Sequence, residues 1–119
     1  VDREEMTAYT ADSIRQIEAR GYKTIAVICS TEEEAWNAEE ALAKVCQIQK
    51  DPEDFTNGVM VLPIHKTKGL EFDAAILWNP NDQAYPLEDA AARLLYVAIT
   101  RALHEVHVFY IGKLSKLLE

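Results

Sequence analysis

The stretch Val59–Trp78, VMVLPIHKTKGLEFDAAILW, contains two apolar runs, Val59–Ile64 and Ala74–Trp78, separated by a short polar segment. A third run, TIAVICS, occupies Thr24–Ser30, and a fourth occupies Val106–Ile111. Continuous apolar runs rich in β-branched residues are typical of strands that are covered on both faces of a parallel sheet. The stretch therefore predicts the centre of a layered α/β fold.

Segments with helical periodicity alternate with these runs and predict helices over residues 3–20, 32–46 and 89–103. In the first segment the apolar residues share one helical face, and Gly21 follows where a helix often ends. Thr31 and Glu34 have the spacing of an N-terminal capping box. In the later two helices, the residues expected to face the core are Ala35, Trp36, Leu42, Val45, Leu94, Leu95, Ala98 and Ala102. The first helix should bury Met6, Thr10, Ile14 and Ile17.

The remaining segments are expected to be loops or short elements. Residues 47–58 contain proline, asparagine and glycine and predict a loop, with a short strand at 46–49. Residues 113–119 predict the start of a terminal helix. The resulting alternation of strands and helices favours an α/β fold with a mostly parallel central sheet.

Composition sets the broad class of the chain. It has 119 residues, 49% apolar and 27% charged, which is typical of one soluble domain. No run approaches the length of a membrane span, and Cys29 and Cys46 lack metal-binding spacing, so we expect a reducing, cytoplasmic setting without a membrane partner. The net charge of −8 argues against a domain that binds nucleic acid alone. Because the chain opens with Val1, we expect a fragment of a longer protein.

The segment His65–Asp73, HKTKGLEFD, follows one predicted strand and leads into another. In parallel sheets ligands bind beyond the carboxyl ends of the strands, which singles out this segment, Ser30–Thr31 and the helix after Trp78. Two lysines and a glycine there can offer ammonium groups and backbone amides to phosphates. A polar turn joining two strands explains the same residues, and spacing alone favours that simpler interpretation.

Arg101 lies near the end of the predicted helix 89–103. On spacing alone it is a surface arginine or the partner of a carboxylate. A guanidinium projected from a rigid helix toward an anion is the functional alternative, because its planar fork stays charged and binds phosphate oxygens. His104 and His107 flank Glu105, but a helix end and a strand need not converge, so no metal site is predicted.

Two strings resemble motifs of the UvrD/Rep superfamily 1A helicases. Residues 59–77 resemble motif V, whose core reads HxxKGLEF, and residues 93–102 contain LLYVAITRA, which resembles motif VI. Residues 25–31 fall where motif IV belongs. The resemblance implies that residues 1–119 form one RecA-like, P-loop NTPase-like 2A domain. It also implies a cytoplasmic, ATP-hydrolysing DNA helicase or translocase as the parent protein.

The resemblance also implies roles for particular residues. Arg101 corresponds to an arginine finger at the γ-phosphate, and Glu71 to a glutamate at the nucleotide ribose, with Gly69 shaping the ATP-contacting loop. His65, Lys66 and Thr67 correspond to the nucleic-acid-contacting part of motif V. The expected ligands are ATP and Mg²⁺. No GxxxxGK[ST] sequence is present, so the metal and the triphosphate should be held by an upstream 1A domain of the same polypeptide, and the isolated domain should be inactive.

The sequence departs from the family pattern and leaves the parent's role open. The large 2B insertion between motifs IV and V is absent, with only a short segment in its place. No arginine lies near Ser30 in the motif IV region, and Pro63 replaces a small hydroxyl residue before His65. The short connection before motif V resembles HelD-type ATPases that act on RNA polymerase, which makes polymerase remodelling an alternative. A non-catalytic RecA-like scaffold is the second alternative.

Overall fold

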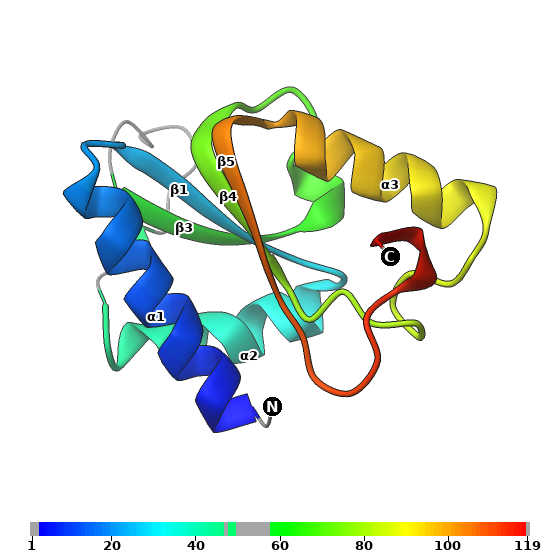
Figure 1. The fold of residues 1–119 in the computed structure, drawn as a ribbon, viewed down its shortest axis with the longest axis horizontal. Coiled ribbons are helices and arrows are strands. Elements are labelled where there is room, and N and C mark those ends of the chain that lie inside the picture. Colours follow the sequence, from blue (N-terminus) through cyan, green and yellow to red (C-terminus); the bar gives the residue numbers. More distant parts are fainter. Residues whose placement is uncertain (1–2, 47, 50–57, 119) are drawn as a thin grey trace.

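The computed structural model describes residues 3–46, 48–49 and 58–118. Its helices and strands follow one another in the order α1 (Arg3–Ala19), β1 (Thr24–Cys29), α2 (Glu32–Ala43), β2 (Ile48–Gln49), β3 (Gly58–Pro63), η2 (Ile64–Lys66), β4 (Phe72–Trp78), α3 (Asp89–Thr100), β5 (Ala102–Phe109) and η3 (Lys116–Leu118). Figure 1 shows the sheet between helices on its two sides. The predicted loop 47–58 lies almost wholly outside the described residues.

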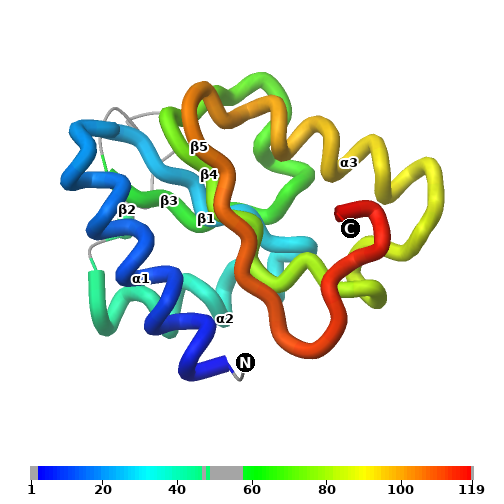
Figure 2. Tube along the Cα trace, viewed as in Figure 1, coloured from blue at the N-terminus to red at the C-terminus, as the bar shows by residue number. Residues whose placement is uncertain are grey.

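All strand pairs of the sheet are parallel, and the strand order is β2-β3-β1-β4-β5. The tube in Figure 2 follows the chain through these crossovers. The central strand β1 is buried from Ile25 to Cys29, and β4 is almost wholly buried, because helices cover both faces of the sheet. The predicted α/β fold with a mostly parallel sheet is therefore confirmed.

Alternate residues of each central strand enter two separate cores. On one face Ile25 and Val27 of β1 pack with α1 and α2, whereas on the other face Ala26 and Ile28 pack with α3. Such alternation follows from the two-residue repeat of a strand. The predicted face of α1 is confirmed, since all four of its residues are buried: Met6, Thr10, Ile14 and Ile17.

Three predicted core positions are wrong. Trp36 is 69% exposed, Val45 48% and Leu94 41%. Helix α2 ends at Ala43, three residues before the predicted end, so Val45 lies in the following turn. Trp36 lines a pocket beside β3, and within the described ranges β2 pairs with β3 only at Val59 and Met60, so the sheet is narrow there.

The predicted boundaries at the carboxyl-terminal end also need correction. Helix α3 ends at Thr100 and β5 begins at Ala102, four residues earlier than predicted, so Ala102 and His104 are strand residues. The expected terminal helix is a single 3₁₀ turn, Lys116–Leu118. No helix within the described ranges has the length and apolar character needed to cross a bilayer.

The amino edge of the sheet is fastened by Asp73 of β4. Its carboxylate accepts hydrogen bonds from the backbone N–H of Lys23 over 2.8 Å and of Thr24 over 3.2 Å. The backbone N–H of Asp73 donates in return to the Thr24 hydroxyl over 2.8 Å. The bond from Lys23, followed by those from Thr24, lowers the pKa of Asp73, because a carboxylate that accepts N–H bonds is stabilised in its charged form.

Candidate functional site

The starts of β4 and β5 lie side by side at the amino edge of the sheet. Phe72, the first residue of β4, is in register with Ala102, the first residue of β5. The backbone N–H of Phe72 donates to the carbonyl oxygen of Arg101 over 2.9 Å. Glu71 and Arg101 each precede one of these strands by one residue. This hydrogen bond therefore joins the two segments that carry them.

This arrangement corrects the prediction that segment 65–73 and the helix after Trp78 serve the carboxyl ends of the strands. A crossover between parallel strands leaves at the carboxyl end of one strand and enters at the amino end of the next. Segment 64–71 and helix α3 each make such a crossover. His65 therefore lies at the carboxyl end of β3, whereas Glu71 and Arg101 lie at the opposite edge.

Arg101 caps the carboxyl end of α3 and is partly buried. Its Nε donates to the carbonyl oxygen of Val97 over 3.2 Å, and the same oxygen accepts a bond from the Thr100 hydroxyl over 3.0 Å. Its terminal nitrogens make no hydrogen bond or ion pair with any residue in the described part of the chain. The alternative that Arg101 pairs with a carboxylate of its own domain is therefore not observed among those residues.

Local hydrogen bonds shape the turn between η2 and β4. The Thr67 hydroxyl is buried and donates to the carbonyl oxygen of Ile64 over 2.7 Å, and the N–H of Leu70 donates to the carbonyl oxygen of Thr67 over 3.1 Å. Gly69 has φ +82°, a left-handed conformation that side chains disfavour. The turn leaves Lys68, Gly69 and Glu71 exposed.

At the carboxyl edge, His65 and Lys66 are exposed and lie near the start of α2. Lys66 Nζ is 3.1 Å from Glu32 Oε1, and His65 Nε2 is 3.8 Å from the same oxygen. The Lys66 ammonium lowers the pKa of Glu32, with a smaller effect from His65. The predicted contact of these residues and Thr67 with nucleic acid stays a prediction, and a phosphate there would compete with Glu32.

A second charged group flanks β5 and was missed by sequence reasoning. Arg20, just after α1, binds both carboxylate oxygens of Glu105 at 2.7 and 2.6 Å, and His107 Nε2 is 2.8 Å from Glu105 Oε1. Arg20 first, then His107, lowers the pKa of Glu105 to about 2. The ring of His104 stacks on Tyr22 with centroids 4.8 Å apart. His107 is thus a strand residue whose ring nitrogen is paired with a carboxylate.

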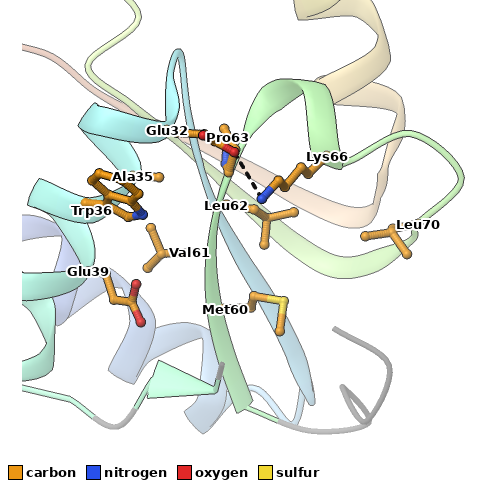
Figure 3. Close-up of a pocket in the computed structure, with 10 residues that line it drawn as sticks. All are labelled: Glu32, Ala35, Trp36, Glu39, Met60, Val61, Leu62, Pro63, Lys66 and Leu70. Atoms are coloured by element: carbon orange, nitrogen blue, oxygen red, sulfur yellow. Dashed lines mark ion pairs between the residues drawn. The ribbon is translucent and has the colours of Figure 1, made fainter. Parts of the chain in front are cut away.

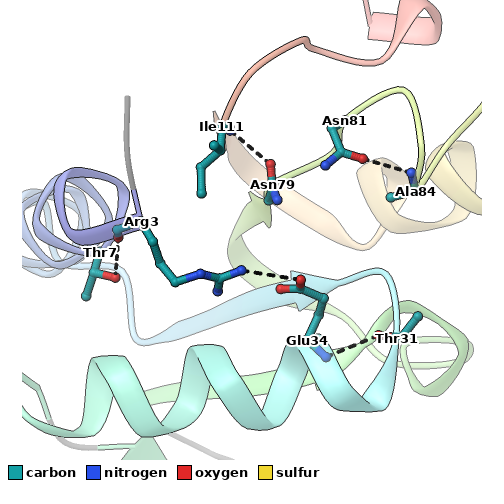
Figure 4. A network of polar contacts seen from close by, with 8 residues as sticks. All are labelled: Arg3, Thr7, Thr31, Glu34, Asn79, Asn81, Ala84 and Ile111. Carbon is teal, nitrogen blue, oxygen red and sulfur yellow. Dashed lines mark hydrogen bonds and ion pairs between the residues drawn. The ribbon is translucent and has the colours of Figure 1, made fainter.

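The polar contacts in Figure 4 fasten the chain around the carboxyl ends of β1 and β4. The Glu34 N–H donates to the Thr31 hydroxyl over 3.1 Å, which confirms half of the predicted capping box. The Glu34 carboxylate instead approaches Arg3 at 3.5 Å and so links α2 to α1. Asn79, with φ +52°, accepts a bond from the N–H of Ile111 over 2.9 Å.

Comparison with known proteins places these features in a family. Residues 58–109 match the family model of the UvrD-like helicase C-terminal domain. The chain also resembles the crystal structure of the C-terminal domain of a possible DNA helicase from Lactobacillus plantarum WCFS1. The two share 34% identity with a TM-score of 0.83, over 95% of this chain and 71% of that one. The chain belongs to the UvrD-like helicase C-terminal domain family. No match was found among curated proteins.

The predicted helicase resemblance and RecA-like fold of this UvrD-like helicase C-terminal domain are therefore confirmed. The matched segment contains all of the predicted site residues: His65, Lys66, Thr67, Gly69, Glu71 and Arg101. The HelD-type subgroup is tested by neither comparison and stays a prediction. Among the described residues, no group of three or more His, Cys, Asp or Glu side chains is placed to hold a metal ion.

Proposed function

We propose that this UvrD-like helicase C-terminal domain completes the ATP site of an upstream, Walker-containing domain. In this proposal Arg101 contacts the γ-phosphate and Glu71 contacts the ribose. The observation that carries the proposal is the state of the Arg101 side chain, whose Nε is bonded to Val97 while its terminal nitrogens have no partner among the described residues. A guanidinium anchored in this way can bind phosphate oxygens without giving up an existing ion pair.

The two proposed nucleotide contacts would move as one unit. The hydrogen bond from Phe72 to the Arg101 carbonyl joins the segment carrying Glu71 to the end of α3. Rigid positioning matters because phosphoryl transfer is catalysed largely by charges that are already in place. Gly69 supports the same unit, since its left-handed conformation sets the path of the turn that leads to Glu71.

In the proposed cycle, closure of this domain over bound ATP brings the Arg101 guanidinium to the charge that develops on the transferred phosphoryl group. Hydrolysis and loss of phosphate remove that charge, which weakens the attraction and lets the domains separate. We propose that Mg²⁺ is held with the triphosphate by the upstream domain. The described residues offer no cluster of three or more metal-binding side chains, so we assign no step of the metal chemistry to them.

We further propose that repeated closing and opening moves a DNA strand past His65, Lys66 and Thr67 at the carboxyl edge of the sheet. The nucleotide contacts and the nucleic-acid contacts would then lie at opposite ends of segment 64–71. This short crossover would then connect the DNA contact with the ATP contact. The polymerase-remodelling alternative rests on the sequence resemblance alone, and the scaffold alternative predicts that Arg101 has no role in turnover.

The proposal is tested by ATP hydrolysis in the full-length protein. Arg101→Ala should lower kcat by about 10³-fold or more. Glu71→Ala should act mainly on KM, because a ribose contact is made equally in the ground state and the transition state. Arg15→Ala, which removes an exposed arginine of α1, is the matched control and should leave both parameters unchanged. Unchanged kcat in Arg101→Ala would favour the scaffold.

A second assay separates the two active alternatives. DNA strand unwinding or translocation by the full-length protein, lost in Arg101→Ala, would support the helicase function. Stable capture of RNA polymerase, with ATP-dependent release and no activity on DNA, would support polymerase remodelling instead.

A further inference from the structure

A pocket of about 270 Å³ lies along the edge of strand β3 that is turned away from β1. Figure 3 shows Trp36 and Glu39 of α2 on one side of β3, with Lys66 and Leu70 on the other. Strand β2 is paired with β3 only at Val59 and Met60, so among the described residues the next part of β3 has no neighbouring strand on this side. The wall of the pocket is therefore formed by apolar residues of β3 and by one face of α2.

Helix α2 presents three pocket-lining side chains in one row. Glu32, Trp36 and Glu39 are separated by four and three residues, the spacing that places helical side chains on the same face. Trp36 is 69% exposed, which is unusual for a residue with so large an apolar side chain. The pocket thus has an aromatic wall with a carboxylate on either side along the helix.

The two carboxylates are not equivalent. Glu32 is paired with Lys66 at 3.1 Å, whereas Glu39 has no hydrogen bond or ion pair with any residue that the structure describes. Glu33 and Glu40 add further negative charge to α2, and the whole chain carries a net charge of −8. The pocket therefore offers one uncompensated carboxylate beside an indole in an acidic surrounding.

We propose that this pocket binds an arginine side chain carried by a basic, otherwise apolar segment of a partner protein. The guanidinium would stack on the Trp36 indole, which attracts cations through its π face, and donate hydrogen bonds to the Glu39 carboxylate. The aliphatic stem would lie against Val61, which Figure 3 shows on the same side of β3 as Trp36 and Glu39. The proposed ATP contacts Gly69, Glu71 and Arg101 do not line this pocket, whereas Lys66, a predicted nucleic-acid contact, does.

Size and charge favour a protein side chain over the other occupants of an aromatic pocket. The volume lies just below the roughly 300–1,000 Å³ of typical small-molecule sites, which suits one side chain. A nucleotide base could stack on Trp36, but its phosphates would face Glu39, which is unpaired among the described residues, and the neighbouring Glu40 of α2. The DNA contact proposed above lies instead at Lys66, where Glu32 is already paired. Phosphates and carboxylates repel each other, whereas a basic segment is attracted to the carboxylates.

Titration of the 119-residue chain with two blocked peptides tests the proposal. The first peptide is acetyl-Ala-Leu-Arg-Leu-Ala-amide, and the second carries citrulline, the uncharged isostere, in place of arginine. Trp36 emission reports binding because Trp78 is buried, and Trp36→Phe identifies the source of the signal. We expect a saturable change with the arginine peptide and about tenfold weaker binding of the citrulline peptide.

Two matched variants locate the site. Glu39→Gln should weaken binding of the arginine peptide about tenfold, because it keeps the shape of the side chain and removes its charge. Glu40→Gln, on the same helix but outside the pocket, should change affinity by no more than about twofold. Their far-ultraviolet circular dichroism and melting temperatures verify that both variants fold as the parent chain does.

Several outcomes would overturn the proposal. These are equal affinity for the two peptides, equal effects of Glu39→Gln and Glu40→Gln, or no saturable change up to about 5 mM peptide. A thymidine oligonucleotide is the final probe. A saturable change in Trp36 emission with the oligonucleotide, in the absence of one with the arginine peptide, would reassign the pocket to nucleic acid.

Discussion

Replacing Asp73 by asparagine is expected to loosen the amino edge of the sheet and to alter the response of stability to acid. The Asp73 carboxylate accepts bonds from the N–H groups of Lys23 and Thr24 over 2.8 and 3.2 Å, which joins β4 to the start of the central strand β1. Asparagine keeps an oxygen acceptor and the side-chain shape but removes the charge. The bond from the Asp73 N–H to the Thr24 hydroxyl involves only the backbone of residue 73 and should remain.

The expected cost at pH 7 follows from these contacts. Hydrogen bonds to a charged group contribute about 1.5–3 kcal/mol, against about 1 kcal/mol for neutral ones. Because Asp73 is partly exposed and its charge is screened by solvent, we take the low end of the difference, about 0.5 kcal/mol for each of the two bonds and so about 1 kcal/mol in the free energy of unfolding. In a domain of this size, that corresponds to a decrease in Tm of about 4 °C.

The pH dependence has a definite sign. The pKa of Asp73 is lower in the folded chain than in the unfolded chain, so its stabilisation is complete above the unfolded value of about 3.9. That stabilisation is lost as the pH falls through the lower, folded-state pKa. The difference between the parent chain and Asp73→Asn should therefore shrink below about pH 4.

Urea unfolding followed by circular dichroism at pH 7 and at pH 3 measures both quantities. Asp12→Asn is the control, because Asp12 is exposed on α1 and its contacts among the described residues stay within that helix: a 3.9 Å ion pair with Arg15 and a hydrogen bond from the Gln16 side chain over 3.2 Å. Equal stability of Asp73→Asn and the parent chain at pH 7 would refute the role of the carboxylate. A gap of the same size at both pH values would refute the assignment of its effect to charge.

Three further predictions concern the packing of particular side chains. Burial raises the pKa of both thiols, and Cys29 is fully buried while Cys46 is half-buried, so a thiol reagent should label Cys46 much faster than Cys29 in the native chain. Gly69→Ala should lower the free energy of unfolding by about 1–2 kcal/mol in urea titrations, because φ +82° is strained for alanine although nothing lies within 4 Å of the added Cβ. Acrylamide should quench Trp36 strongly and Trp78 weakly, so Trp36→Phe should leave a blue-shifted emission that resists quenching.

Much of the fold could be predicted because burial leaves a local trace in the sequence. The apolar runs that became β1, β3 and β4 are covered on both faces, and their composition shows it directly. The buried face of α1 repeats at helical spacing for the same reason. Errors arose where coverage stops. Trp36 and Leu94 have core-like spacing but are exposed. Leu94 lies beside the buried row of α3, which is Ala91, Leu95 and Ala98, and spacing does not record how wide the covered face of a helix is.

The candidate site was predicted in part. Motif strings singled out Glu71 and Arg101 as individual residues, and the structure brings their segments together through the bond from Phe72. We predicted that both residues lie at the carboxyl ends of the strands, and this was wrong. Each residue ends a crossover and directly precedes a strand, so both lie at the amino edge of the sheet. The Arg20–Glu105 pair has no local signal, since its members are 85 residues apart in the sequence.

The central claim is that the Arg101 guanidinium reaches the triphosphate of another domain and acts on the transition state. It is tested most directly by comparing two affinities of the full-length protein, one for ATP and one for ADP with aluminium fluoride, a mimic of the transferred phosphoryl group. Arg101→Ala should weaken binding of the mimic by about 10³-fold or more while changing ATP affinity far less. Equal effects on both ligands, or no effect on either, would contradict the account.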